Sequence, residues 1–210
     1  EYFRAWQESY VFYVQMELCA NGTLRHLLTR DGHTLKLPGA ESRVWEMTTH
    51  IARGLAHIHS YEVMHCDLKP DNILISGDGV FKIGDLGHAT GLKAWDEQEG
   101  DACYLSRDLL EARPSTAADI FSFGIMLYEI KTAEELPGSG PHWEYLRSGQ
   151  VPPPAGCGAR LAPLIQAMMS PYPEARPTAD HILQGCCAAA ADAALAAALA
   201  GAAGGTMDTR

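Results

Sequence analysis

The chain has 210 residues, of which 47% are hydrophobic, and it carries a formal net charge of −10 at pH 7. This length and apolar content suit one globular domain, or one domain and a tail. The negative charge disfavours nucleic acid and anionic membrane surfaces as partners, because both are polyanions.

The six cysteines are scattered, and no two of them have the spacing of zinc ligands. We expect reduced thiols, which are typical of proteins that work inside the cell. The chain shows no signal peptide and does not begin with Met, so we expect its first residues to lie within a domain.

The N-terminal part predicts two strands and a helix. Aromatic and β-branched residues mark strands at Tyr2–Trp6 and Tyr10–Leu18, and we expect the turn between them at 7–9. Cys19–Gly22 should end the second strand. Thr23 is then placed to cap a helix whose leucines share one face.

Apolar spacing predicts helices through much of the remaining chain. They are expected at Glu41–Tyr61, Asp119–Ile130, Trp143–Arg147 and Leu161–Met169, with another helix after Thr178.

The motif HCDLKPDNIL, at His65–Leu74, has the layout of a protein-kinase catalytic loop. Its Asp, Lys and Asn are Asp67, Lys69 and Asn72. A carboxylate at Asp67 is suited to orient an acceptor hydroxyl and take its proton, and Lys69 is suited to neutralise charge on a transferred phosphoryl group. The motif therefore predicts a site of phosphoryl transfer.

A second motif, KIGDLGH at Lys82–His88, supplies Asp85 after a Gly-Asp-Gly turn at Gly77–Gly79. Asn72 and Asp85 offer oxygen atoms, the ligands that Mg²⁺ prefers. An Asp-x-Lys or an Asp-x-Gly alone is usually a solvated turn. The two motifs in this order, between apolar strands, are hard to obtain by chance and favour the same site.

Residues 185–210 are an Ala- and Gly-rich segment of low complexity, outside the domain expected at 1–184. Its alanines favour helix. Its length is about what a membrane span requires, which leaves membrane attachment open. Alanine is only weakly apolar, however, and Asp192 lies inside the stretch.

Over residues 1–184 the chain resembles the eukaryotic protein kinases, and within them it looks most like the Wee and Myt kinases. YFRAW at Tyr2–Trp6, Asp-Leu-Gly-His from Asp85, and EGD at Glu99–Asp101 carry the narrower likeness. The resemblance implies an α+β, protein-kinase-like fold with a mostly α-helical C-terminal lobe and the last strands of an N-terminal lobe. It also implies ATP and Mg²⁺ as cofactors.

The resemblance assigns further residues to the nucleotide site. Backbone groups near Glu17 and Cys19 would meet the adenine. Met16 would lie at the back of that pocket and Leu74 beneath the adenine.

The family pattern also predicts structural contacts around the activation segment, which we take as His88–Asp108. Asp119 would cap the catalytic-loop backbone, and Arg176 would form a buried pair with Asp108. Cys66 replaces the usual Arg before the catalytic Asp, as in Wee kinases, so a phosphate on the segment would lack a local cation. We therefore expect a segment that is ordered without phosphorylation. Cys103 replaces an Arg of the family.

No glycine-rich loop, strand lysine or partner glutamate of a small lobe occurs in these residues, and those parts hold ATP. We expect the 210 residues alone to bind ATP poorly and to transfer nothing measurable. The whole gene product would be the enzyme.

The resemblance implies a kinase that phosphorylates tyrosine, or threonine and tyrosine, of a cyclin-dependent kinase and so inhibits mitotic entry. Its location would be the nucleus or the cytoplasm. A kinase of the translation initiation factor 2 alpha subunit is an alternative, because YVQMELCANGTL and KIGD resemble that group. A non-catalytic kinase-like binding module is another, although the four polar residues of the two motifs are all present.

Overall fold

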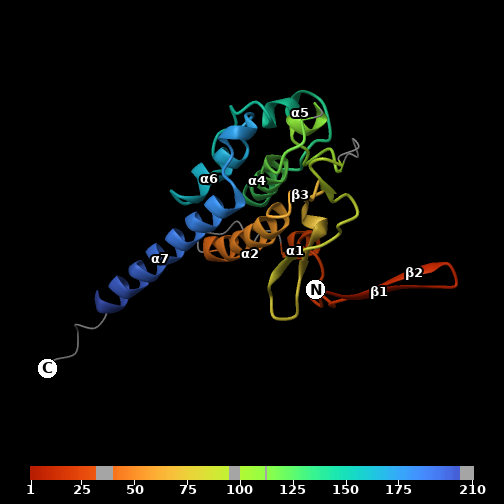
Figure 1. Ribbon diagram of the computed structural model, residues 1–210. Coiled ribbons are helices and arrows are strands. Elements are labelled where there is room, and N and C mark those ends of the chain that lie inside the picture. The colour runs from red at the N-terminus through yellow and green to blue at the C-terminus, as the bar shows by residue number, and fades with distance from the viewer. Residues whose placement is uncertain (32–39, 95–99, 112, 204–210) are drawn as a thin grey trace.

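The computed structural model describes residues 1–31, 40–94, 100–111 and 113–203, with the backbone alone for 31 and 192–203. Within these ranges the helices form one body, and a two-stranded hairpin projects from it near the N-terminus (Figure 1).

The body is helical and is centred on one apolar helix. The helices of the described part are α1 Leu24–Asp31, α2 Glu41–His59, α3 Arg107–Leu110, α4 Ala117–Thr132, α5 Pro141–Leu146, α6 Leu161–Met168 and α7 Ala179–Ala203. Helix α4 is buried on nearly every face, because its sequence is apolar all round. Helix α6 packs against α4, and α7 packs against α2. Gly124 permits the close approach of α4 to α6, since a Cβ there would lie 2.7 Å from the Cβ of Met168.

Short antiparallel strand pairs hold the two sequence motifs. In the described residues β1 Tyr2–Glu8 pairs with β2 Val11–Met16, β3 Val63–Met64 with β6 Thr90–Gly91, and β4 Ile73–Ile75 with β5 Phe81–Ile83. The first motif fills the loop between β3 and β4, and the second runs on from β5. The predicted α+β organisation, with strands leading into a mostly helical lobe, is confirmed.

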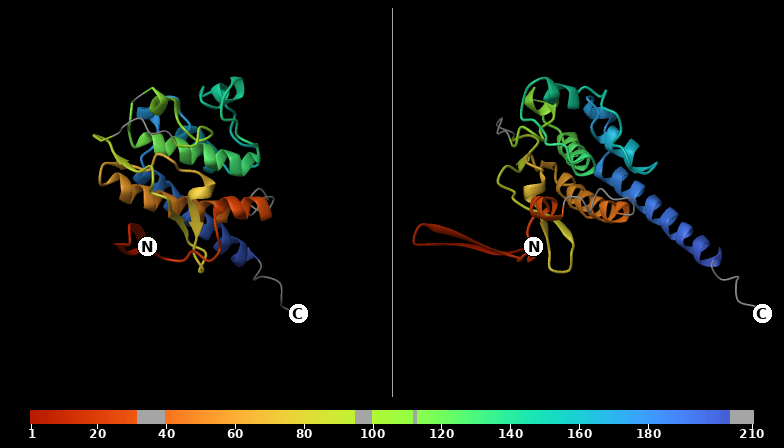
Figure 2. Two further views of the ribbon diagram at one scale, coloured as in Figure 1. Left: turned by 90° about the vertical axis from the view of Figure 1, so that its right-hand side faces the viewer. Right: turned by 180° about the vertical axis from the view of Figure 1, so that it is seen from behind.

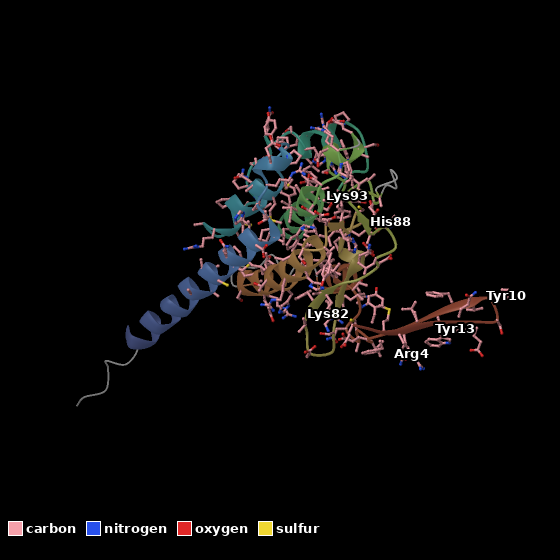
Figure 3. All side chains as sticks on the ribbon, in the orientation of Figure 1. Arg4, Tyr10, Tyr13, Lys82, His88 and Lys93 are labelled. Carbon is pink, nitrogen blue, oxygen red and sulfur yellow. The ribbon has the colours of Figure 1, made fainter. Side chains whose placement is uncertain are left out.

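The β1–β2 hairpin is exposed along both strands. It points away from the body in Figure 1 and in the view from behind in Figure 2. Its side chains Arg4, Tyr10 and Tyr13 stand clear of the body (Figure 3). The turn predicted at 7–9 is wrong, because β1 continues to Glu8 and the turn lies at Ser9 and Tyr10, with φ of 49° and 64°. Such a turn usually contains Gly or Asn, and neither is present here to mark it.

Other expected elements agree with the structure to within one or two residues at their ends. Thr23 caps α1 by accepting the amide of His26 at 3.1 Å, and Thr178 caps α7 by accepting that of His181 at 3.2 Å. Helix α7 runs without a break through residue 184, where a domain boundary was expected. None of the helices in the described part combines the length and the hydropathy that crossing a membrane takes.

Candidate active site

The loop that carries the first motif is fixed by a buried carboxylate from α4. Asp119, 1% exposed, accepts the backbone amides of His65 at 2.8 Å and Cys66 at 3.0 Å. Its Oδ2 also lies 2.8 Å from Nε2 of His59, at the end of α2. The predicted cap is therefore confirmed, and it joins two helices to the loop.

Asp67, Lys69 and Asn72 converge in this loop. Asn72 donates from Nδ2 to Oδ2 of Asp67 at 2.8 Å and to the backbone oxygen of Asp67 at 2.8 Å. Lys69 places Nζ 3.0 Å from the same Oδ2. Because Asp67 takes up the amide nitrogen of Asn72, the amide oxygen of Asn72 remains for another partner.

The charge of Lys69 is stabilised by two carboxylates. Its Nζ lies 3.6 Å from Oδ2 of Asp101 as well as close to Asp67. Burial disfavours the ammonium, but the hydrogen bonds and charges of Asp67 and Asp101 outweigh burial and raise the pKa of Lys69. Lys69 is thus a cation at neutral pH, as neutralising a phosphoryl group requires.

A glycine and an acid of the activation segment cover Asp67. The backbone amide of Asp101 donates to Oδ1 of Asp67 at 2.9 Å. A Cβ at Gly100 would lie 2.3 Å from the backbone oxygen of Cys66 and 2.9 Å from Oδ1 of Asp67. The close approach to Asp67 therefore explains the Gly and the Asp of the EGD motif, at positions 100 and 101. Its first residue, Glu99, lies outside the described residues.

Asp85 is brought to the loop through the peptide just before it. The amide of Gly84 donates to the backbone oxygen of Asn72 at 2.8 Å, and the oxygen of Gly84 lies 2.9 Å from Nε2 of His65. Asp85 itself has a left-handed backbone, with φ of 53°, and its Oδ1 accepts the amide of Gly87 at 3.1 Å. Asp85 thus directly follows a residue, Gly84, whose backbone is bonded to both His65 and Asn72 of the first motif.

These oxygens suit a magnesium ion that arrives with a nucleotide. Mg²⁺ usually takes one or two protein ligands and completes its shell with phosphate and water oxygens. Asn72 and Asp85 match that donor set. Across the described part of the chain, no group of three or more His, Cys, Asp or Glu is arranged to hold a metal alone. A bound Mg²⁺ would neutralise phosphate charge at this point.

Of the residues predicted for the adenine site, Leu74 lies on β4 and Cys19 lies in the chain that leads up to this strand. Thr23 forms a β-bridge with Leu74, which brings the chain after β2 against this strand. The backbone oxygen of Cys19 in that chain accepts the amide of Gly22 at 3.2 Å. Leu74 packs over Gly84, where a Cβ would lie 2.8 Å from its Cδ1.

The other two, Met16 and Glu17, lie where the hairpin joins the body. Nζ of Lys82, on β5, lies 2.6 and 2.7 Å from the two carboxylate oxygens of Glu17, and this hydrogen-bonded pair lowers the pKa of Glu17. Met16 ends β2 and is 42% exposed. A role for these residues in binding ATP stays a prediction.

The end of the activation segment is held by a buried ion pair. Nη2 of Arg176 lies 2.6 Å from Oδ1 of Asp108, and both side chains are 1% exposed. This confirms the predicted partner despite the shorter acid. Cys66 supplies no cation, because a thiol is either neutral or anionic. Burial, with the charges of Asp119 and Asp67, raises the pKa of this thiol to about 12 and so keeps it neutral.

A polar cluster that sequence reasoning missed ties α1 to the same region. Arg25 donates to Oδ2 of Asp71 at 3.2 Å, to Oε1 of Glu129 at 2.7 Å, and to the hydroxyl of Tyr104. That hydroxyl donates to Oε2 of Glu129 at 2.7 Å. These residues are far apart in sequence and carry no local pattern, so no signal in a single chain joins them.

His88 was also assigned no role beyond its place in the second motif. Its Nδ1 lies 3.8 Å from Oδ2 of Asp67 and is buried, and no described residue forms a hydrogen bond with it. Figure 3 shows His88 on the segment that follows β5. The unusual His after Asp-Leu-Gly was the one feature of the sequence that could have pointed to a residue near Asp67.

Comparison with known proteins identifies one family model. The model described as the protein kinase domain matches residues 1–186.

Individual relatives are between 33% and 40% identical to the chain over the residues that align. A probable protein kinase of Dictyostelium discoideum is 40% identical over 86% of this chain and 53% of its own length. The membrane-associated tyrosine- and threonine-specific cdc2-inhibitory kinase wee-1.3 of Caenorhabditis elegans is 33% identical over 87% of this chain and 27% of its own length. The mitosis inhibitor protein kinase wee1 of Schizosaccharomyces pombe is 35% identical over 87% and 24% respectively. The chain thus spans between about a quarter and about half of these relatives.

Proposed function

This chain belongs to the protein kinase family, and from that premise we propose that it supplies the catalytic lobe of a Wee-type kinase. The whole protein would transfer the γ-phosphoryl group of ATP to tyrosine, or to threonine and tyrosine, of a cyclin-dependent kinase. Such a transfer would inhibit mitotic entry.

The observation that carries the catalytic part of the proposal is the set of donors around Asp67. Asn72, Lys69 and the amide of Asp101 all point to its carboxylate, at 2.8, 3.0 and 2.9 Å. A carboxylate held in this way has one orientation, which a general base needs in order to meet an acceptor hydroxyl.

The other residues divide the remaining work. Lys69 would hold positive charge next to the transferred phosphoryl group. Asn72 and Asp85 would present oxygens to the metal-bound phosphates. The protein would thus contribute position and charge, which are the main requirements of this reaction.

The choice of acceptor rests on likeness. Relatives named as cdc2-inhibitory and mitosis-inhibitor kinases cover most of the chain at 33% and 35% identity. The Leu and His after Asp85, and the Gly-Asp at 100–101, support the same type. An intracellular location, nuclear or cytoplasmic, follows from such an acceptor, and imaging of the tagged whole protein would test it.

The experiment uses the whole gene product with Mg-ATP and two acceptors, a cyclin-dependent kinase with its cyclin and the translation initiation factor 2 alpha subunit. Mass spectrometry then maps the modified residue. We expect tyrosine, or threonine and tyrosine, on the cyclin-dependent kinase, loss of transfer in Asp67→Asn, and unchanged transfer in Asp180→Asn, an exposed control. Transfer to the initiation factor alone would replace the proposed acceptor. Absence of transfer to either would favour a non-catalytic binding module.

A further inference from the structure

Helix α5 and the residue after it hold the backbone of the activation segment just beyond Asp101. Arg147, 2% exposed, donates from Nε to the oxygen of Leu105 at 2.7 Å. Its Nη2 donates to the oxygens of Cys103 at 3.0 Å and Ala102 at 3.3 Å. Trp143 adds a bond from Nε1 to the oxygen of Ala102 at 2.8 Å.

Arg147 keeps a charge in the interior without a carboxylate partner. Its guanidinium lies 3.7 Å from the ring centre of Trp143 and 5.3 Å from that of Phe121, and no carboxylate in the described part forms an ion pair with it. Burial lowers its pKa to about 9, so it remains charged at neutral pH. A buried charge is costly, and an apolar side chain would fill the same space at lower cost. The burial of an arginine at position 147 is therefore explained by the backbone oxygens to which its guanidinium donates.

The backbone that Arg147 holds is continuous with the contacts to the base. Asp101 donates its amide to Asp67 at 2.9 Å and places its carboxylate 3.6 Å from Nζ of Lys69. One short stretch of chain is thus bonded to α5 on one side and to the catalytic loop on the other. Asn72, on the nucleotide side, is instead bonded to Asp67 and to the backbone after β5.

We propose that Arg147 is a positioning residue for the acceptor side of the transfer reaction. Together with Trp143 it fixes the backbone of 102–105, and through that backbone it holds Asp101 against Asp67. The proposal rests on the proposed kinase activity. It requires the KM for the protein acceptor to depend on Arg147, while the KM for Mg-ATP does not, because β4 and β5 hold the nucleotide side.

The test compares variants of the whole gene product. Arg147→Met removes the charge and the donors but keeps much of the volume, Arg147→Lys keeps the charge without the planar fork, and Trp143→Phe removes one N–H. Arg113→Met is the matched control, because Arg113 is an exposed arginine paired with an exposed glutamate. Amide hydrogen exchange is followed in 101–106 and in 117–132, and KM is measured separately for the cyclin-dependent kinase and for Mg-ATP.

In Arg147→Met we expect exchange in 101–106 and the acceptor KM each to rise at least about tenfold, since several bonds to a charged donor are lost. Exchange in 117–132 and the KM for Mg-ATP should stay within about twofold of the wild type. Arg147→Lys should be intermediate, and the Arg113 control should be unchanged.

Unchanged exchange in 101–106 in both Arg147→Met and Trp143→Phe would overturn the proposal. If Arg147→Met also exchanges rapidly throughout α4, Trp143→Phe decides. A rise confined to 101–106 in that variant, with a raised acceptor KM, supports the proposal, and wild-type values overturn it. A wild-type protein that phosphorylates nothing would refute the proposed function, and the exchange measurements would still decide whether Arg147 orders the segment.

Discussion

Replacing Gly100 by alanine should impair transfer, because the new methyl group has no room. The Cβ would lie 2.3 Å from the backbone oxygen of Cys66, whereas ordinary contacts begin near 3.4 Å. Relief requires the segment to move outward by roughly 1 Å. That movement would stretch the bond from the amide of Asp101 to Asp67, now 2.9 Å, beyond hydrogen-bonding range.

The size of the effect follows from the bond that is lost. A hydrogen bond to a charged group is worth about 1.5–3 kcal/mol, so we expect kcat/KM for the protein acceptor to fall about ten- to a hundredfold. The assay is steady-state phosphorylation by the whole gene product, with thermal unfolding measured alongside it. A fall in kcat/KM with little change in Tm would show that the substitution disturbs the proposed general base, Asp67, and leaves the stability of the fold unchanged.

Gly77→Ala is the matched control. Gly77 lies in the turn between β4 and β5, and a Cβ there would meet nothing within 4 Å. This variant should keep the wild-type rate. If Gly100→Ala retains activity within about threefold, the close approach of the segment to Asp67 has no part in the reaction and the reasoning is wrong.

Other predictions follow from buried or paired groups. Asp108→Asn leaves Arg176 charged and unpaired in the interior, so the free energy of unfolding in urea should fall by about 3–5 kcal/mol. Lys82→Met should raise the pKa of Glu17, measured by carboxyl NMR. The pair stabilises the fold above the ordinary glutamate pKa of 4.5 and loses that effect as pH falls through the lowered value, so the variant should lose less stability on acidification. Cys66 should resist iodoacetamide in the native protein at pH 8 and react in urea, because its pKa is raised to about 12.

The parts of the site that the sequence predicts are those set by local spacing. Asp67, Lys69 and Asn72 lie within one loop between short strands, so their offsets alone bring them together. Caps such as Thr23 act within one helical turn and are equally local. The pairing of Arg176 with Asp108 joins residues 68 positions apart, and only the family resemblance made it predictable.

The parts that could not be predicted depend on contacts between distant, irregular segments. Asp101 reaches Asp67 across 34 positions from a stretch without regular structure, and Arg147 reaches Ala102 across 45. No periodicity marks such contacts. The helix that runs through residue 184 is of another kind, because the composition of 185–203 itself favours helix. Alanine propagates a helix without needing a buried face, so the change in composition there does not end α7.

Position 66 carries a thiol, and the backbone just beyond Asp101 is held by Trp143 of α5 and by Arg147. A cation here would sit beside Asp119 and Asp67, whose charges already raise the pKa of Cys66. With a neutral thiol instead, nothing at position 66 attracts an anion, and the backbone oxygens of residues 102, 103 and 105 are held by the buried guanidinium of Arg147. Those bonds are shielded from water and salt and need no modification to form. They supply a physical basis for the expectation that the segment is ordered without phosphorylation.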